Sequence, residues 1–178
     1  MSSFQDWMIR AAKLDVNLYE EVEADTTATG QAMGVVVLSS VAAGIGTIAK
    51  GGLVGILIGT VAALVGWCIW AWLTYFIGTK WLPEPQTKAD FGELLRTIGF
   101  SSSPGLIRVL GIIPGLERSI FLAAGIWMLV AMVIAVRQAL DYKSTGRAVG
   151  VCVIGWIIQI TILMLLFGIA GGGAPKTF

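Results

Sequence analysis

The stretch that decides the fold runs from Leu53 to Gly78 and reads LVGILIGTVAALVGWCIWAWLTYFIG. It contains no charged residue, and as a helix rising 1.5 Å per residue it would be about 39 Å long. The hydrocarbon core of a bilayer is roughly 30 Å thick, so such a helix spans the membrane and must tilt or protrude. The aromatic residues near its far end, which are typical of a belt at the membrane surface, are Trp70, Trp72 and Tyr75.

The composition of the whole chain agrees with a membrane protein. Of its 178 residues, 56% are hydrophobic and only 13% are charged, whereas about 25% are charged in soluble domains. No acidic residue occurs between Asp25 and Glu84, and none follows Asp141. The net charge of +1 offers no basic stripe for a nucleic-acid partner. We therefore predict an all-α integral membrane protein in a lipid bilayer, whose further clear spans lie at about 31–49, 119–136 and 148–170.

Residues 1–30 precede the first of these spans and carry six acidic side chains, so we expect no cleavable signal peptide. Within them, apolar residues recur at spacings of three and four from Phe4 to Leu14, which predicts an amphipathic helix over 3–18. Two placements stay open. The helix lies flat at the membrane surface, with Phe4 and Trp7 among the headgroups, or it docks on the protein's own loops. We favour the interfacial helix.

The stretch 91–117 is ambiguous, because it combines apolar residues with Arg96, Arg108 and a helix-breaking sequence at Ser101–Pro104. If it crosses the membrane, the protein has five spans, and eight Lys and Arg residues lie on one side against three on the other. Without it there are four spans, and the division becomes eight against four. Both arrangements place the N-terminus in the cytoplasm, where positive charges gather, and the charge rule prefers five spans only slightly.

Small residues recur every four positions where the second span begins. A shallow stripe on one helix face, which lets a neighbouring backbone approach closely, would be formed by Gly51, Gly55, Gly59 and Ala63. Either the first two spans pack along this stripe as a hairpin, which we favour, or the stripe is a face for self-association. In the last span, Gln159 is a candidate for a hydrogen bond between helices.

Arg96 and Arg108 are cations inside or beside the membrane, where a charge needs a partner or water. One interpretation is contact with an anion or a lipid headgroup, for which Ser103 is a third candidate. The other, which we favour, is that both arginine side chains reach back to the two membrane surfaces.

The sequence gives little support for a catalytic, metal or cofactor site. The chain has no histidine, which removes the commonest general base, and no pair of carboxylates lies in a span. Cys68 and Cys152 lie in apolar runs and should behave as small hydrophobic residues. Gly44 and Gly46 match part of a dinucleotide fingerprint, but no acidic residue follows about 20 positions later. We expect no enzyme, no metal and no cofactor.

Three motifs follow one another in fixed order: FGELLRTIGFSSSPGLIR over 91–108, Ile112-Ile-Pro-Gly115, and VRQALDYKSTGRA over 136–148. Together they resemble the Yip1 domain family in its bacterial form. The resemblance implies five transmembrane helices, the third broken around Ser101–Pro104, and a cytoplasmic N-terminus in the bacterial inner membrane. We accordingly divide the chain into a cytoplasmic N-terminal segment, a Yip1-like transmembrane domain and a flexible tail, at 1–30, 31–170 and 171–178.

The sequence thus favours a five-helix bundle with an interfacial N-terminal helix. Its expected role is that of a non-enzymatic scaffold, assembly factor or partner-binding subunit, with other membrane proteins or a second copy as partner. The alternative is a small transporter or channel for a solute or anion, because the break at Ser101–Pro104 and the charge of Arg108 could line a polar cavity near the midplane.

Overall fold

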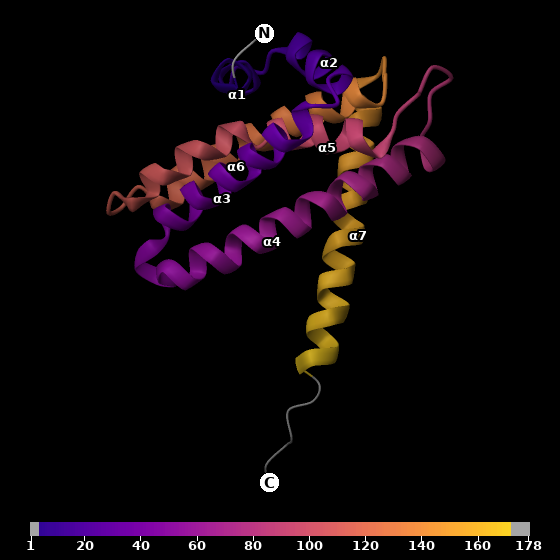
Figure 1. Ribbon diagram of the computed structural model, residues 1–178. Coiled ribbons are helices and arrows are strands. Elements are labelled where there is room, and N and C mark those ends of the chain that lie inside the picture. Colours follow the sequence, from indigo (N-terminus) through magenta and orange to yellow (C-terminus); the bar gives the residue numbers. More distant parts are fainter. Residues whose placement is uncertain (1–3, 172–178) are drawn as a thin grey trace.

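A computed structural model describes residues 4–171, with side chains up to Ile162 and at Met164 (Figure 1). The short helices of the N-terminal part are α1 (Phe4–Ala12) and α2 (Val16–Ala24). They are followed by α3 (Ala28–Gly46), α4 (Ile48–Phe76) and a π-helical turn, η1 (Ile77–Trp81). After a linker come α5 (Phe91–Phe100), the 3-10 helix η2 (Ser103–Ile112), α6 (Glu117–Ala139) and α7 (Thr145–Gly171). Of the predicted tail at 171–178, Gly171 ends α7, and residues 172–178 lie outside the described residues.

Four helical stretches among these residues are long and apolar enough to cross a bilayer: Ala28–Gly46, Ile48–Trp81, Glu117–Ala139 and Thr145–Ile162. They confirm the prediction of a helical membrane protein. The remaining predicted span, at 91–117, is not among them, because α5 and η2 are separate and shorter helices. In Figure 1, α3, α4 and α6 run close together, and α7 crosses α4 at a steep angle.

The break between α5 and η2 falls at the predicted position. Pro104 has no N–H to donate and is tolerated in the first turn of a helix, which is where it stands in η2. The hydroxyls of Ser101 and Ser103 donate to the carbonyl oxygens of Ile98 and Phe100, at 2.7 and 2.8 Å. Carbonyls at the end of α5 therefore keep partners although the α-helix stops there.

The broken segment, residues 91–112, runs alongside α3 and in the same direction. Its glycines meet successive positions of α3: Gly99 lies against Ala32, Gly105 against Ser39 and Gly111 against Gly46. A Cβ added to any of these three glycines of the broken segment would come within 3.0 Å of another atom. The two backbones thus approach each other at a distance that only glycine allows.

The N-terminal part forms two helices, which corrects the prediction of one helix over 3–18. The chain turns at Leu14, whose φ of 62° lies in the left-handed region. Asp15 then begins a new helix by accepting the N–H of Asn17 at 3.0 Å. A side-chain oxygen at this position replaces a missing helical acceptor, and this favours a fresh helix start over a continuous helix.

Helix α1 packs on the protein through the predicted apolar stripe. Trp7 is 5% exposed, and its ring meets Phe100 edge-on with the ring centroids 5.6 Å apart. The indole N–H of Trp7 donates to Glu21 of α2 at 2.9 Å, and Arg10 donates to the same carboxylate at 2.6 Å. These contacts agree with the docking alternative for α1, whereas its placement at a membrane surface stays a prediction.

Replacing Gly46 with Ala should destabilise the protein, because the new Cβ would collide with the carbonyl group of Arg108. Overpacking of this kind costs about 1–3 kcal/mol. Gly59→Ala is the matched control, since a Cβ there meets no atom within 4 Å. Thermal unfolding in detergent, followed by tryptophan fluorescence, should give a lower Tm for Gly46→Ala and an unchanged or higher Tm for Gly59→Ala. Equal Tm values for the two variants would contradict the close packing.

Candidate functional site

A cavity of about 500 Å³ lies among α3, α4, η2, α6 and α7; we call it the membrane cavity. Most of its wall is apolar or formed by small residues, and its large side chains include Trp67, Met128, Met132 and Trp156. Polar residues interrupt this wall at Ser39, Ser40, Thr47, Ser102, Arg108 and Gln159. An apolar cavity with a few polar groups is the usual form of a small-molecule site.

Arg108 is the charged residue among those that line the membrane cavity. Its Nε donates to the carbonyl oxygen of Gly105 at 3.0 Å, and its Nη2 donates to the carbonyl oxygen and the Oγ of Ser39, at 3.2 and 2.7 Å. The backbone of Arg108 lies beside Gly46, at the end of α3. Ser39 lies seven residues before Gly46 in α3, which is about 10 Å along the helix axis. The side chain thus points back along α3, away from the end that Gly46 marks, and its favoured placement at a membrane surface stays a prediction.

The predicted small-residue stripe borders the membrane cavity and is not the seam between α3 and α4. Gly55, Gly59 and Ala63 line the cavity, and a Cβ on Gly51, Gly55 or Gly59 would meet no atom within 4 Å. Gln159 lines the cavity from α7, and its side chain makes no hydrogen bond to another described residue. Four of the predicted residues therefore line the same cavity as Arg108: two glycines, one alanine and one glutamine.

The hairpin of α3 and α4 forms through other residues. Ile56 of α4 sits on Gly44, where an added Cβ would come within 2.7 Å of the isoleucine side chain. Ser40 Oγ and Thr60 Oγ1 form a 3.2 Å hydrogen bond between the same two helices. The contact between α3 and α4 therefore places Gly44 of the first span against Ile56 of the second. The favoured prediction had placed the glycines of the second span in this contact.

Arg96 and Ser103 lie away from the membrane cavity. Arg96 is 5% exposed, and its guanidinium donates to the carbonyl oxygens of Val22, at 3.0 Å, and of Glu23. These carbonyls belong to the last turn of α2, where partial negative charge gathers and helical partners run out. Ser103 is buried and donates to Phe100. Both residues hold the fold together through carbonyl groups of the chain itself.

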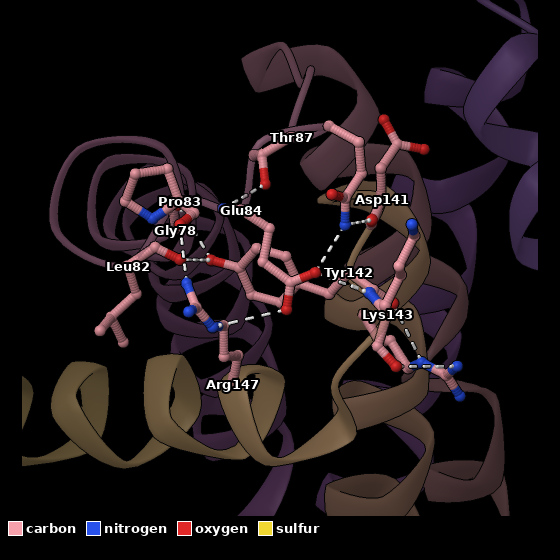
Figure 2. Close-up of polar contacts among 11 residues, drawn as sticks. Gly78, Leu82, Pro83, Glu84, Thr87, Asp141, Tyr142, Lys143 and Arg147 are labelled. Atoms are coloured by element: carbon pink, nitrogen blue, oxygen red, sulfur yellow. Dashed lines mark hydrogen bonds and ion pairs between the residues drawn. The ribbon is translucent and has the colours of Figure 1, made fainter.

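A second region lies outside the apolar helices, where the linker after η1 meets the loop between α6 and α7 (Figure 2). Tyr142 anchors the loop: it is 3% exposed, and its Oη lies 2.9 Å from the carbonyl oxygen of Gly78 and 2.8 Å from that of Leu82. Carbonyl groups at a helix end need donors from elsewhere, and the phenol supplies one to η1.

Glu84 joins linker and loop from the opposite side of this contact (Figure 2). Its carboxylate accepts the N–H of Lys143 at 3.0 Å and lies 3.4 Å from Nε of Arg147. The bond from Lys143 holds the pKa of Glu84 below its usual value, so the carboxylate stays charged near neutral pH. Gln86 donates to the carbonyl oxygen of Asp141 at 2.9 Å. We call the surface formed by residues 82–87 and 141–147 the loop platform.

Beside the loop platform lies a cavity of about 570 Å³, here called the acidic cavity. Two cations, Arg137 and Lys143, also line it, and its four carboxylates are those of Glu20, Glu23, Glu93 and Asp141. Burial, with repulsion from the other three acids, raises the pKa of Glu23 to about 8. Among the described residues, no group of three or more Cys, Asp or Glu side chains is arranged to hold a metal ion.

The sequence profile of the Yip1 domain matches residues 19–167, from within α2 to near the end of α7. The chain belongs to the Yip1 domain family. This confirms the resemblance found in the sequence, and with the four apolar helices it makes the chain a multi-pass integral membrane protein. No curated protein and no solved structure matches the chain. Both cavities and the loop platform lie within the matched Yip1 domain.

Sequence reasoning missed the residues that hold the loop platform of this Yip1 domain. Tyr142 and Arg147 belong to the motif that carried the resemblance, but nothing in the motif assigned them a partner. Glu84 and Lys143 are 59 positions apart, so no spacing rule joins them. The available signal was Glu84 itself, a carboxylate on a backbone that Pro83 and Pro85 restrict.

The raised pKa of Glu23 should make the stability of the protein depend on pH. Its carboxyl group ionises near pH 8 when folded and near 4.5 when unfolded, so the stability that this group contributes is fully present below about pH 4.5 and is lost as pH rises through 8. Tm measured between pH 5.5 and 8.5 should decline, and Glu23→Gln should decline less because it cannot ionise. Glu117→Gln, far from the acidic cavity, should keep the slope of the unaltered protein. If Tm changed equally with pH in all three proteins, Glu23 would not be the group that causes the pH dependence.

Proposed function

We propose that this Yip1-family protein is a non-enzymatic scaffold or partner-binding subunit of the cytoplasmic membrane. The observation that carries the proposal is the loop platform. Fixing one backbone residue costs about 1–2 kcal/mol of conformational entropy, and a mobile loop would connect α6 to α7 equally well. Hydrogen bonds donated by Tyr142 and Gln86, and one that Glu84 accepts from Lys143, nevertheless hold linker and loop together. Ordered loops on a rigid helical support are where proteins place their contact surfaces.

The acidic cavity indicates the chemistry that the partner would present. With Glu23 protonated near neutral pH, its three charged carboxylates still outnumber its two cations, and Glu84 beside it is also charged. Charge complementarity steers association and selects partners more than it adds affinity. A protein segment that carries Lys or Arg residues therefore suits this surface best.

A photoreactive amino acid at Lys143, which is exposed on the loop platform, should form a discrete adduct with a protein in cells. The same amino acid at Trp72, 53% exposed on an apolar helix, should react with lipid only. Glu84→Ala should weaken the adduct at 143, because the loop loses the acceptor of the 143 N–H. An adduct of twice the mass of the chain would identify a second copy as the partner. The scaffold function would be contradicted if no protein adduct formed at position 143, or if Glu84→Ala left the yield of the adduct unchanged.

We further propose five membrane passages, with the N-terminus and the loop platform in the cytoplasm. Two contacts, each between residues far apart in the sequence, support this topology. Lys50 Nζ lies 2.6 Å from Glu117 Oε1, and Glu84 is joined to the loop at Lys143. With only four passages, the members of each pair would lie on opposite sides of the bilayer. The parallel course of residues 91–112 along α3 supplies the extra passage, and the excess of positive charge favours the cytoplasm for the loop platform.

Single cysteines should report this topology in a chain that carries Cys68→Ala and Cys152→Ala. An impermeant thiol reagent should label Leu116→Cys from outside the cell only, and Lys88→Cys and Lys143→Cys from inside only. All three side chains are exposed, so access depends on the side of the membrane. Labelling of positions 88 and 116 from the same side would establish four passages. The protein without cysteine is the background control.

A pathway for a small solute or anion is the second candidate, and the membrane cavity at Arg108 is the observation that favours it. The two functions differ in whether water reaches this cavity from a membrane surface. Adding Arg108→Cys to the labelling series separates them, because a hydrated pathway admits the reagent and a packed bundle excludes it.

A further inference from the structure

The charge of Arg108 has no counter-charge in the described part of the protein. Its hydrogen bonds go to a backbone carbonyl of η2 and to the carbonyl and hydroxyl of Ser39, all of them neutral groups. Its Nη1 donates to no described protein atom. A guanidinium between membrane-spanning helices is costly unless it meets an anion or water. Because the side chain turns away from the nearer end of α3, its unmatched charge faces the membrane cavity.

The rest of the membrane cavity suits an alkyl chain. Met128, Met132 and Trp156 line it, and on the α4 side Gly55 and Gly59 leave open space within 4 Å of where a Cβ would stand. Its volume of about 500 Å³ lies within the range of sites that hold one small molecule. Trp70 also lines it; this residue is 7% exposed, and its Nε1 has no hydrogen-bond partner.

We propose that the membrane cavity binds a long-chain fatty acid, with its carboxylate on Arg108 and its chain along the glycine side of α4. Guanidinium and carboxylate match in charge and in planar, two-point geometry. The depth of the site selects a single-chain ligand. The guanidinium meets Ser39, about 10 Å from the end of α3. The phosphate of a two-chain phospholipid is held at the membrane surface, whereas a fatty acid can enter between the helices. This ligand goes beyond the scaffold function.

Brominated stearic acid tests the proposal, since bromine quenches nearby tryptophans and Trp67, Trp70 and Trp156 line the membrane cavity. The purified full chain is placed in nanodiscs of phosphatidylcholine, which carry no net charge, and titrated with the acid at pH 8.5. We expect saturable quenching, with binding at least tenfold weaker for the methyl ester of the same acid. This comparison needs no variant and keeps the site intact.

Variants then locate the two ends of the ligand. Arg108→Leu should weaken binding of the acid at least tenfold and leave the ester unchanged, and Arg108→Lys, which keeps the charge but loses the two-point geometry, should bind the acid with an affinity between those of the unaltered chain and Arg108→Leu. Arg118→Leu, which removes an exposed cation elsewhere, is the matched control and should bind as the unaltered chain does. Gly59→Leu should fold, because its Cβ enters open space, but should fill the cavity and reduce binding at least tenfold.

Several results would overturn the proposal. Equal affinity for the acid and its ester, or an unaltered affinity in Arg108→Leu, would show that the carboxylate does not meet Arg108. Unaltered affinity in Gly59→Leu would place the chain outside the cavity. Displacement of the acid by phosphatidylglycerol added to the nanodiscs would assign the guanidinium to a phospholipid phosphate instead.

Discussion

Close contact between α3 and the broken segment 91–112 is the constraint on which the rest of the structure depends. Backbone polar groups inside hydrocarbon must find partners within the protein, and a 3-10 helix after a proline does this less well than an α-helix. The glycines at 46, 105 and 111 let α3 and α6 enclose η2. This enclosure holds Arg108 between helices and, together with the open side of α4, creates the membrane cavity.

The two arginines of the broken segment show how position decides the use of one side chain. Arg96 stands where α2 ends, and its donors are taken up by carbonyls that the helix leaves without partners. Arg108 stands three turns further along, beside Ser39, and keeps part of its hydrogen-bonding capacity for the cavity. The first therefore contributes to stability through neutral dipoles, and the second is the residue with chemistry to offer a ligand.

The sequence predicts what depends on local pattern. It identified the apolar helices, the break at Ser101–Pro104 and the family, because hydropathy, proline and motif order are read along the chain. It could not decide whether α3 and α4 would meet at the glycines 51, 55 and 59 of the second span or at Gly44 of the first, since both are suited to close packing. The turn at Leu14, the contact of Arg96 with α2 and the anchoring of Tyr142 also depend on partners far away or on a single backbone angle.

The parallel course of α3 and η2 also has a consequence for biosynthesis. Ribosomes deliver the chain from its N-terminus, so α3 and α4 reach the bilayer before residues 91–112 leave the exit tunnel. A short segment with an arginine and a proline is a poor substrate for the insertion machinery when it is offered to lipid alone. Here the segment meets α3, whose Gly46 lies against the backbone of Arg108 and whose Ser39 accepts a hydrogen bond from the Arg108 side chain. In the proposed five-passage topology, the order of elements along the chain would thus let the first span act as a template for the passage of residues 91–112.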